Sequence, residues 1–130
     1  MESVGRMFTL DTNILIAHFN DEPKVEAFLR SVRAEGKRLF ISVVTEIELL
    51  ALPRLTPEEI EAIERLLREF SAVPLDSQLG KLTASVRRTT KLALGDSVVV
   101  ATAVFTNSTL VTRDREILKR AKGIVRTKAI

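Results

Sequence analysis

The feature that most constrains the fold is a short apolar run that ends in an aspartate and leads directly into a helix. Residues 7–10 (Met-Phe-Thr-Leu) suit a buried strand. Asp11 follows, and Thr12 and Asn13 are typical of a first helical turn before the apolar residues 14–17. Asp11 is therefore expected where a strand ends and a helix begins, which is the edge of an open α/β sheet at which ligands bind.

Strands and helices are expected to alternate along the whole chain. Further strands are expected at residues 39–44, 72–75, 109–111 and 124–125. Helices are expected at 23–35, at 45–51, after the capping box at 56–59, after Asp76 as a helix cap, and at 98–105 and 115–122. This alternation predicts a single α/β domain over residues 1–130, with a central parallel sheet of about five strands between two helical layers.

Two segments allow more than one structural interpretation. Pro74 removes a backbone donor, so the strand at 72–75 is expected at the edge of the sheet. Residues 98–105 are rich in valine, which would also suit a strand. Their alanines, the capped start at Asp96 and the strand that follows favour a buried helix.

Composition narrows the class of protein. Hydrophobic residues make up 45% of the 130 residues, enough for one buried core. No apolar run approaches the roughly 20 residues that span a bilayer, and residues 1–6 do not resemble a secretory signal. A cytoplasmic protein without membrane contact is therefore expected. The formal charge of +3 permits binding to a polyanion without establishing it.

The shortage of nitrogen and sulfur ligands excludes several kinds of site. The chain has no cysteine, so it has neither a disulfide framework nor a thiolate metal site. Its one histidine, His18, argues against a zinc site rich in histidine and against a Ser-His-Asp triad. A structural role is expected for His18.

Three aspartates share one kind of position. Asp11, Asp96 and Asp114 each lie between an apolar segment and the start of a helix. If the strands before Asp11 and Asp114 are neighbours, their carboxylates meet at one edge of the sheet, and Asp96 can cap a helix above it. Clustered carboxylates repel one another, and oxygen ligands favour Mg²⁺ or Mn²⁺. Each aspartate could equally be only an N-cap, worth about 1 kcal/mol.

Four segments, in order, resemble the motifs of the PIN-domain nucleases. They are Asp11-Thr12-Asn13, residues 42–49 (Ser-Val-Val-Thr-Glu-Ile-Glu-Leu), residues 94–97 (Leu-Gly-Asp-Ser) with the Val/Ala run behind them, and residues 110–114 (Leu-Val-Thr-Arg-Asp). The length is similar to that of lone domains such as the VapC-type toxins. Gly95 and Ser97 depart from the proline and alanine that usually flank the third acid.

The resemblance implies a metal-dependent endoribonuclease with an acidic quartet. Its members would be Asp11, Glu48, Asp96 and Asp114, holding Mg²⁺ or Mn²⁺, with Asp11 and Asp96 as principal ligands. Glu46 and Glu48 would point about 200° apart on a helix, so only one can face the site. The family pattern selects Glu48.

The resemblance also implies supporting residues and partners. Thr12, Asn13 and Thr112 would orient carboxylates by hydrogen bonds, although each could instead satisfy a turn. The partners would be an RNA substrate, a second copy in a homodimer, and a small antitoxin protein. Cations near the motifs could hold RNA phosphates or simply be solvated: Arg87, Arg88, Lys91, Arg113 and Arg115. The alternative function is a non-catalytic RNA-binding or scaffold domain with the same fold.

Overall fold

A five-stranded parallel sheet forms the centre of the molecule, as expected. The computed structural model describes residues 7–130, so the segment 1–6, for which no secretory signal is expected, lies outside the described residues. The strands are β1 (Phe8–Leu10), β2 (Leu39–Ser42), β3 (Ser71–Val73), β4 (Thr109–Val111) and β5 (Thr127–Lys128). Their order across the sheet is β3-β2-β1-β4-β5, and every neighbouring pair is parallel.

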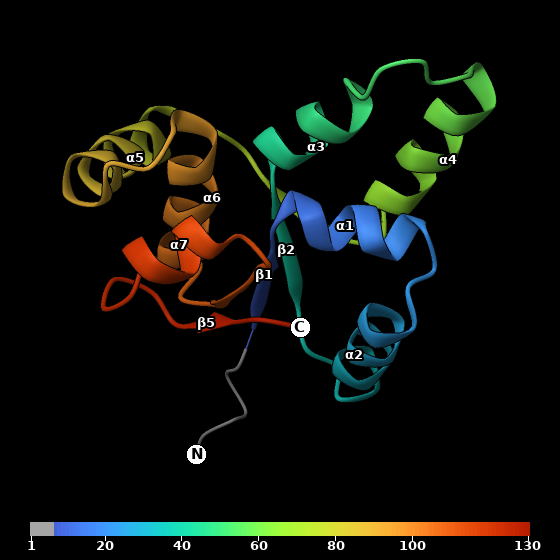
Figure 1. Ribbon diagram of the computed structural model, residues 1–130, viewed down its shortest axis with the longest axis horizontal. Helices are drawn as coiled ribbons and strands as arrows, with labels where there is room; N and C mark the ends of the chain where they lie inside the picture. The colour runs from blue at the N-terminus through green and yellow to red at the C-terminus, as the bar shows by residue number, and fades with distance from the viewer. Residues whose placement is uncertain (1–6) are drawn as a thin grey trace.

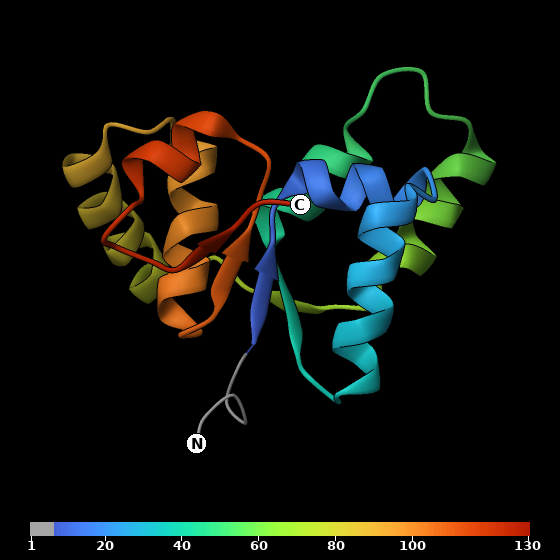
Figure 2. The same cartoon turned by 60° about the horizontal axis from the view of Figure 1, so that its bottom comes forward.

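Helices cover both faces of this sheet. They are α1 (Thr12–Phe19), α2 (Pro23–Ala34), α3 (Val43–Leu50), α4 (Pro57–Leu67), α5 (Ser77–Thr90), α6 (Leu94–Phe105) and α7 (Arg115–Arg120). Figures 1 and 2 show α1 to α4 on one side of the sheet and α5 to α7 on the other. The expected three-layer α/β architecture is therefore confirmed. No helix among the described residues is long and apolar enough to cross a membrane.

The alternation of side chains along the strands builds one hydrophobic core on each face. On β2, Ile41 packs with the α1–α4 layer while its neighbour Phe40 packs with the α5–α7 layer. On β4, Val111 and Leu110 divide in the same way. Because all of these side chains are buried, a shift of register by one residue would exchange the two sets, and the register is firmly specified.

The register between β1 and β4 positions the edge of the sheet where polar residues gather. Leu10 pairs with Val111, so Asp11 and Thr112 follow at the same level, and the Asp11 amide donates to the Val111 carbonyl at 3.0 Å. The chain order also reverses between these strands, since β2 and β3 lie on one side and β4 and β5 on the other. Crevices for ligands form at such switch points.

Most expectations for individual elements are confirmed. The strand before Pro74 is at the edge of the sheet, and the valine-rich segment is the buried helix α6. Asp76 caps α5 by accepting a hydrogen bond from the Leu79 amide at 2.9 Å.

Four expectations were wrong. Residues 43–44, expected at the end of the second strand, are the start of α3, because the Ser42 side chain caps this helix by accepting from the Val44 amide at 3.0 Å. The third strand, expected at 72–75, is Ser71–Val73 and ends before Pro74, which lacks a backbone donor.

The other two errors concern the last strand and Asp96. The last strand is β5 at Thr127–Lys128 and does not include residues 124–125. Ile124 and Val125 pack their side chains against the core in a turn after Gly123 (φ 89°), and the backbone pairs with β4 only from Arg126 onward. Asp96 is not a helix cap, because α6 begins two residues before it and Ala93 holds the cap position.

Candidate active site

Four carboxylates from four different elements gather at the carboxyl end of β1 and β4. Asp11 precedes α1, Glu48 lies in α3, Asp96 in the first turn of α6, and Asp114 precedes α7. Burial is the main cause that raises the pKa of Asp11 and of Asp96; the charges of Asp114 and Glu48 add to the rise at Asp11, and those of the other three acids add to the rise at Asp96. The structure therefore brings together the acids that the four sequence motifs contain.

Asp11 is the most enclosed of the four, with 5% of its surface exposed. One carboxylate oxygen accepts from the Thr12 amide at 2.8 Å, and the other accepts from the Thr112 hydroxyl at 2.6 Å and the Asn13 side-chain amide at 3.4 Å. Burial raises the pKa of Asp11, while the hydrogen bonds from Thr112 and Thr12 oppose that rise. These donors fix the carboxylate in one orientation.

Glu48 is held by the second residue of the first motif. The Thr12 hydroxyl donates to Glu48 Oε1 at 2.5 Å and lies 3.2 Å from the hydroxyl of buried Thr45. The other oxygen, Oε2, would be 3.7 Å from a Cβ added at Gly95. Glu48 therefore lies between the start of α1 and the start of α6.

Glu46 lies on a different surface of the same helix. It lines a hollow with side chains of α3, α4 and the turn after α4, among them Leu50, Glu64 and Phe70. The geometry thus separates Glu46 from Glu48 in the way that helical spacing requires.

Asp96 carries the least compensated charge of the site. Within residues 7–130, no group donates a hydrogen bond to its carboxylate. Burial raises the pKa of Asp96 to about 6, with further contributions from Asp114, Asp11 and Glu48 in that order. A carboxylate held among three others in this way favours binding either a proton or a cation.

Asp114 joins the site to α7. Its Oδ1 accepts from the amides of Glu116 and Ile117 at 2.8 and 3.1 Å, so it also acts as the expected helix cap. Its own amide donates to the Thr112 hydroxyl at 3.0 Å, and that hydroxyl donates to Asp11. Thr112 therefore connects two of the four acids.

Comparisons with known proteins identify the family of this fold. The family model described as "PIN domain" matches residues 8–123. This chain belongs to the PIN domain family. No match was found among curated proteins.

Solved structures share the fold of this PIN domain over nearly its whole length. A chain of the DNA-bound VapBC from Salmonella typhimurium has a TM-score of 0.80 at 22% identity, covering 95% of this chain and 98% of that chain. A chain of a toxin-antitoxin complex from Klebsiella pneumoniae has a TM-score of 0.75 at 23% identity, covering 92% and 94%. A chain of FitAcB from Neisseria gonorrhoeae has a TM-score of 0.72 at 26% identity, covering 93% and 96%.

The donor set of this PIN domain fits a hard divalent cation. Its four acids offer only oxygen atoms, which suit Mg²⁺ and Mn²⁺. In the described part of the chain, no three acidic or histidine side chains already converge as a closed metal cage. The fit therefore rests on oxygen chemistry and on the burial and mutual repulsion that together raise the pKa of Asp96.

The supporting residues of the PIN domain make the hydrogen bonds expected of them. Thr12 and Thr112 donate to carboxylates, and Asn13 contacts both ends of the site. The Asn13 side chain donates to Asp11, and its Oδ1 accepts from the Arg113 amide at 3.3 Å. Asn13 therefore couples the segment after β1 to the segment after β4.

The four arginines proposed as RNA contacts fall into two groups. Arg87 and Arg88 are exposed in the last turn of α5, and Arg115 is exposed at the start of α7. The Arg113 guanidinium is already engaged, because it donates to both carboxylate oxygens of Glu22 and to the Ile130 backbone oxygen at 2.8 Å. This pairing lowers the pKa of Glu22 and makes Arg113 the least suited of the four to hold a phosphate.

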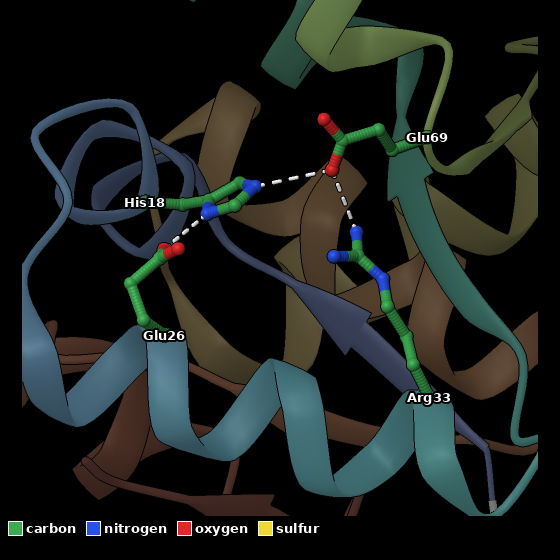
Figure 3. A network of polar contacts seen from close by, with 4 residues as sticks. All are labelled: His18, Glu26, Arg33 and Glu69. Carbon is green, nitrogen blue, oxygen red and sulfur yellow. Dashed lines mark hydrogen bonds and ion pairs between the residues drawn. The ribbon is translucent and has the colours of Figure 1, made fainter.

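His18 lies at the far end of α1 from Asp11 and belongs to another network (Figure 3). Its Nδ1 contacts Glu26, its Nε2 contacts Glu69 at 3.2 Å, and Glu69 also accepts from Arg33 at 2.7 Å. The imidazole thus ties α1 to α2 and to the turn before β3. These contacts are those of a structural histidine.

Two residues of the site had not been singled out from the sequence. Thr45 lies within the second motif, and its spacing from Ser42 was the available signal. Glu22 pairs with Arg113 across 91 residues of sequence, and no local pattern announces such a contact.

Proposed function

We propose that this PIN domain is a metal-dependent endoribonuclease that hydrolyses phosphodiester bonds of RNA. The observation that carries the proposal is the gathering of Asp11, Glu48, Asp96 and Asp114 at one edge of the sheet, with the pKa of Asp96 raised to about 6. A carboxylate that is partly buried among other acids is costly to a fold and is typical of sites that bind cations or protons during catalysis.

The cofactor is Mg²⁺, with Mn²⁺ as a substitute. When bound, the ion supplies neutralising charge and activates water for attack on a phosphodiester. Asp11 and Asp96 act as principal ligands, and Glu48 and Asp114 as supporting ones. Because no closed cage exists beforehand among residues 7–130, the less restrained carboxylates must adjust on binding while Asp11 keeps its three donors.

The residues around the acids orient them. Thr112 holds Asp11 and accepts from the Asp114 amide, so it fixes the distance between the segments after β1 and β4. Thr12 orients Glu48, and Asn13 connects Asp11 to the backbone before Asp114. Such outer hydrogen bonds tune the affinity for metal and the geometry of a site.

In the cell, the protein acts as the toxin of a type II toxin–antitoxin pair. The similar chains from Salmonella typhimurium and Klebsiella pneumoniae belong to VapBC or toxin-antitoxin complexes, which supports this role. The proposal includes a cytoplasmic location, a homodimer and a small antitoxin protein that covers the acidic site. Light scattering of the purified protein, alone and with the product of the adjacent gene, tests both assemblies.

The competing function is a non-catalytic scaffold that binds RNA. Asp96 argues against it, because a binding surface for phosphates gains nothing from an uncompensated carboxylate. A scaffold would also show no gain in melting temperature with millimolar Mg²⁺, whereas a metal-binding protein is stabilised by mass action.

The test is cleavage of a mixed pool of transfer and ribosomal RNA with Mg²⁺ or with EDTA. Wild type is compared with Asp96→Asn and with the control Asp21→Asn, an exposed acid whose left-handed backbone (φ 55°) also suits asparagine. We expect cleavage that requires metal, survives in the control and disappears in Asp96→Asn, while circular dichroism shows both variants folded. Cleavage that persists in Asp96→Asn or in EDTA would refute the proposal.

A further inference from the structure

Helices α5 and α7 on one side of the sheet and α4 on the other side carry opposite charge. Residues 77–95, which include α5, contain four cations and no acid, and residues 115–122, which include α7, contain four cations and one acid. We call these two segments the basic wing. Residues 57–69, which include α4, contain five glutamates and two arginines, and we call them the acidic wing.

The two parts of the basic wing are in contact. Arg120 of α7 donates to the Thr90 carbonyl at the end of α5, at 3.3 Å. Figures 1 and 2 show α5, α6 and α7 together on one side of the sheet, with α4 on the other side. The two segments of the wing therefore adjoin on one side of the sheet.

This surface borders the site. Lys91 is the C-cap residue directly after α5, five residues before Asp96, and Arg115 directly follows Asp114. In the last turn of α5, Arg87 lies about 100° around the helix from buried Val86, and Arg88 lies about 200° away. Arg87 is therefore nearer than Arg88 to the side of α5 that packs on α6.

The cations of the basic wing are exposed and largely without acidic partners. All eight side chains are exposed: Lys81, Arg87, Arg88, Lys91, Arg115, Lys119, Arg120 and Lys122. Of these eight, only Arg120 is paired with a carboxylate of residues 7–130, that of Glu116. Arg113, by contrast, is turned to Glu22 and does not belong to this surface.

We propose that a single RNA strand leaves the acidic site along the basic wing, with its phosphates held by Arg87, Lys91 and Arg115. This proposal rests on the proposed function, since it assigns the path of that enzyme's substrate. Lys and Arg contacts to phosphates supply affinity without reading sequence. The acidic wing repels the same polyanion, so the substrate is held on one side of the cut only.

The test compares two triple variants that remove equal charge. The basic-wing variant carries Arg87→Gln, Lys91→Gln and Arg115→Gln, and the control carries Arg54→Gln, Arg65→Gln and Arg68→Gln in and next to the acidic wing. Each set contains one residue with a left-handed backbone, Lys91 (φ 62°) or Arg54 (φ 63°), so the two sets are also matched in backbone cost.

The measurement is fluorescence anisotropy of a labelled 12-nucleotide single-stranded RNA in EDTA, titrated at several salt concentrations. We expect the basic-wing variant to bind at least about tenfold more weakly at low salt, with a salt slope smaller by about 2, since each phosphate contact on a single strand contributes about 0.7. The control variant should stay within about threefold of wild type.

Equal losses in both variants, or none in the basic-wing variant, would overturn the proposed path. A loss confined to a DNA duplex of matched length would overturn it as well. Failure of the proposed function would give a different result. In that case wild type would not cut RNA in the presence of Mg²⁺, regardless of how tightly the two variants bind RNA.

Discussion

Neutralising Asp96 should stabilise the protein when no metal is bound. The fold holds this carboxylate beside three others, and its pKa lies at about 6 instead of 3.8. An acid whose pKa is raised by folding costs stability at every pH at which it is ionised in the folded state. Asp96→Asn keeps the size of the side chain and removes that charge.

The magnitude follows from the shift in pKa. About two pKa units correspond to about 3 kcal/mol between the protonated and ionised forms. Because the carboxylate is partly exposed, screening by water and salt reduces this to about 1.5 kcal/mol. The substitution also loses a favourable interaction with the amino end of α6, about 0.5 kcal/mol, which leaves a net gain of about 1 kcal/mol. For a domain of this size, that gain raises the melting temperature by about 3–5 °C.

The assay is thermal unfolding at pH 7 in EDTA and in 10 mM Mg²⁺. The control is Asp76→Asn, which removes a helix-terminal charge outside the quartet and keeps a capping side chain. We expect Asp96→Asn to melt above wild type in EDTA, Asp76→Asn to melt at or below it, and Mg²⁺ to raise wild type more than Asp96→Asn. The reasoning is refuted if Asp96→Asn melts below wild type in EDTA, or if Mg²⁺ raises both equally.

Three further predictions concern pH, a buried hydroxyl and the two arginines beside Asp114. In EDTA, the contribution of Asp96 to the free energy of unfolding should fall as pH rises from about 4 to about 6, and saturating Mg²⁺ should remove this fall. Urea titrations at a series of pH values measure the free energy of unfolding. The same dependence on pH with and without Mg²⁺ would contradict the prediction. Thr112→Val should cost about 1–3 kcal/mol and weaken Mg²⁺ binding by calorimetry, because it removes a donor from buried Asp11; Thr102→Val, which loses only a bond to the Val98 carbonyl within α6, should leave Mg²⁺ affinity unchanged. Arg113→Gln should lower Mg²⁺ affinity, because it releases the segment before Asp114 from Glu22. Arg115→Gln should leave Mg²⁺ affinity intact and raise KM for RNA, because this side chain is exposed. The reverse pattern would show that the two arginines have exchanged roles.

The sequence predicted the layers of the fold because they follow from local patterns. Alternating apolar and helical segments imply a covered parallel sheet, and the proline after β3 implies an edge strand. Strand order is different, since alternation alone does not say that β1 lies between β2 and β4. Spacing alone therefore predicted that Asp11 and Asp114 are adjacent only if their strands are neighbours. The resemblance to the family motifs indicated that the two acids belong to one site.

Each error treated a local preference of the residues as decisive where the rest of the fold overrides it. Apolar residues indicate burial, and burial does not require pairing in a sheet; Ile124 and Val125 fill the core from a turn. In the same way, Asp96 was expected as a cap because aspartate favours that position, whereas the turn at Ala93 begins α6 earlier. Contacts such as Glu22 with Arg113 depend on how distant segments pack, and no local pattern encodes them.

Capping and catalysis are compatible at this site, which explains how the fold tolerates four clustered acids. Asp11 and Asp114 each accept hydrogen bonds from backbone amides at the start of a helix, so each offsets part of the repulsion that it causes. Glu48 is compensated by the Thr12 hydroxyl. Asp96 lies beyond the cap position and accepts no hydrogen bond from residues 7–130, so its charge is retained at a net cost. Among the four acids it is therefore the one whose neutralisation separates stability from activity, because removing Asp11 or Asp114 would weaken a helix as well as the site.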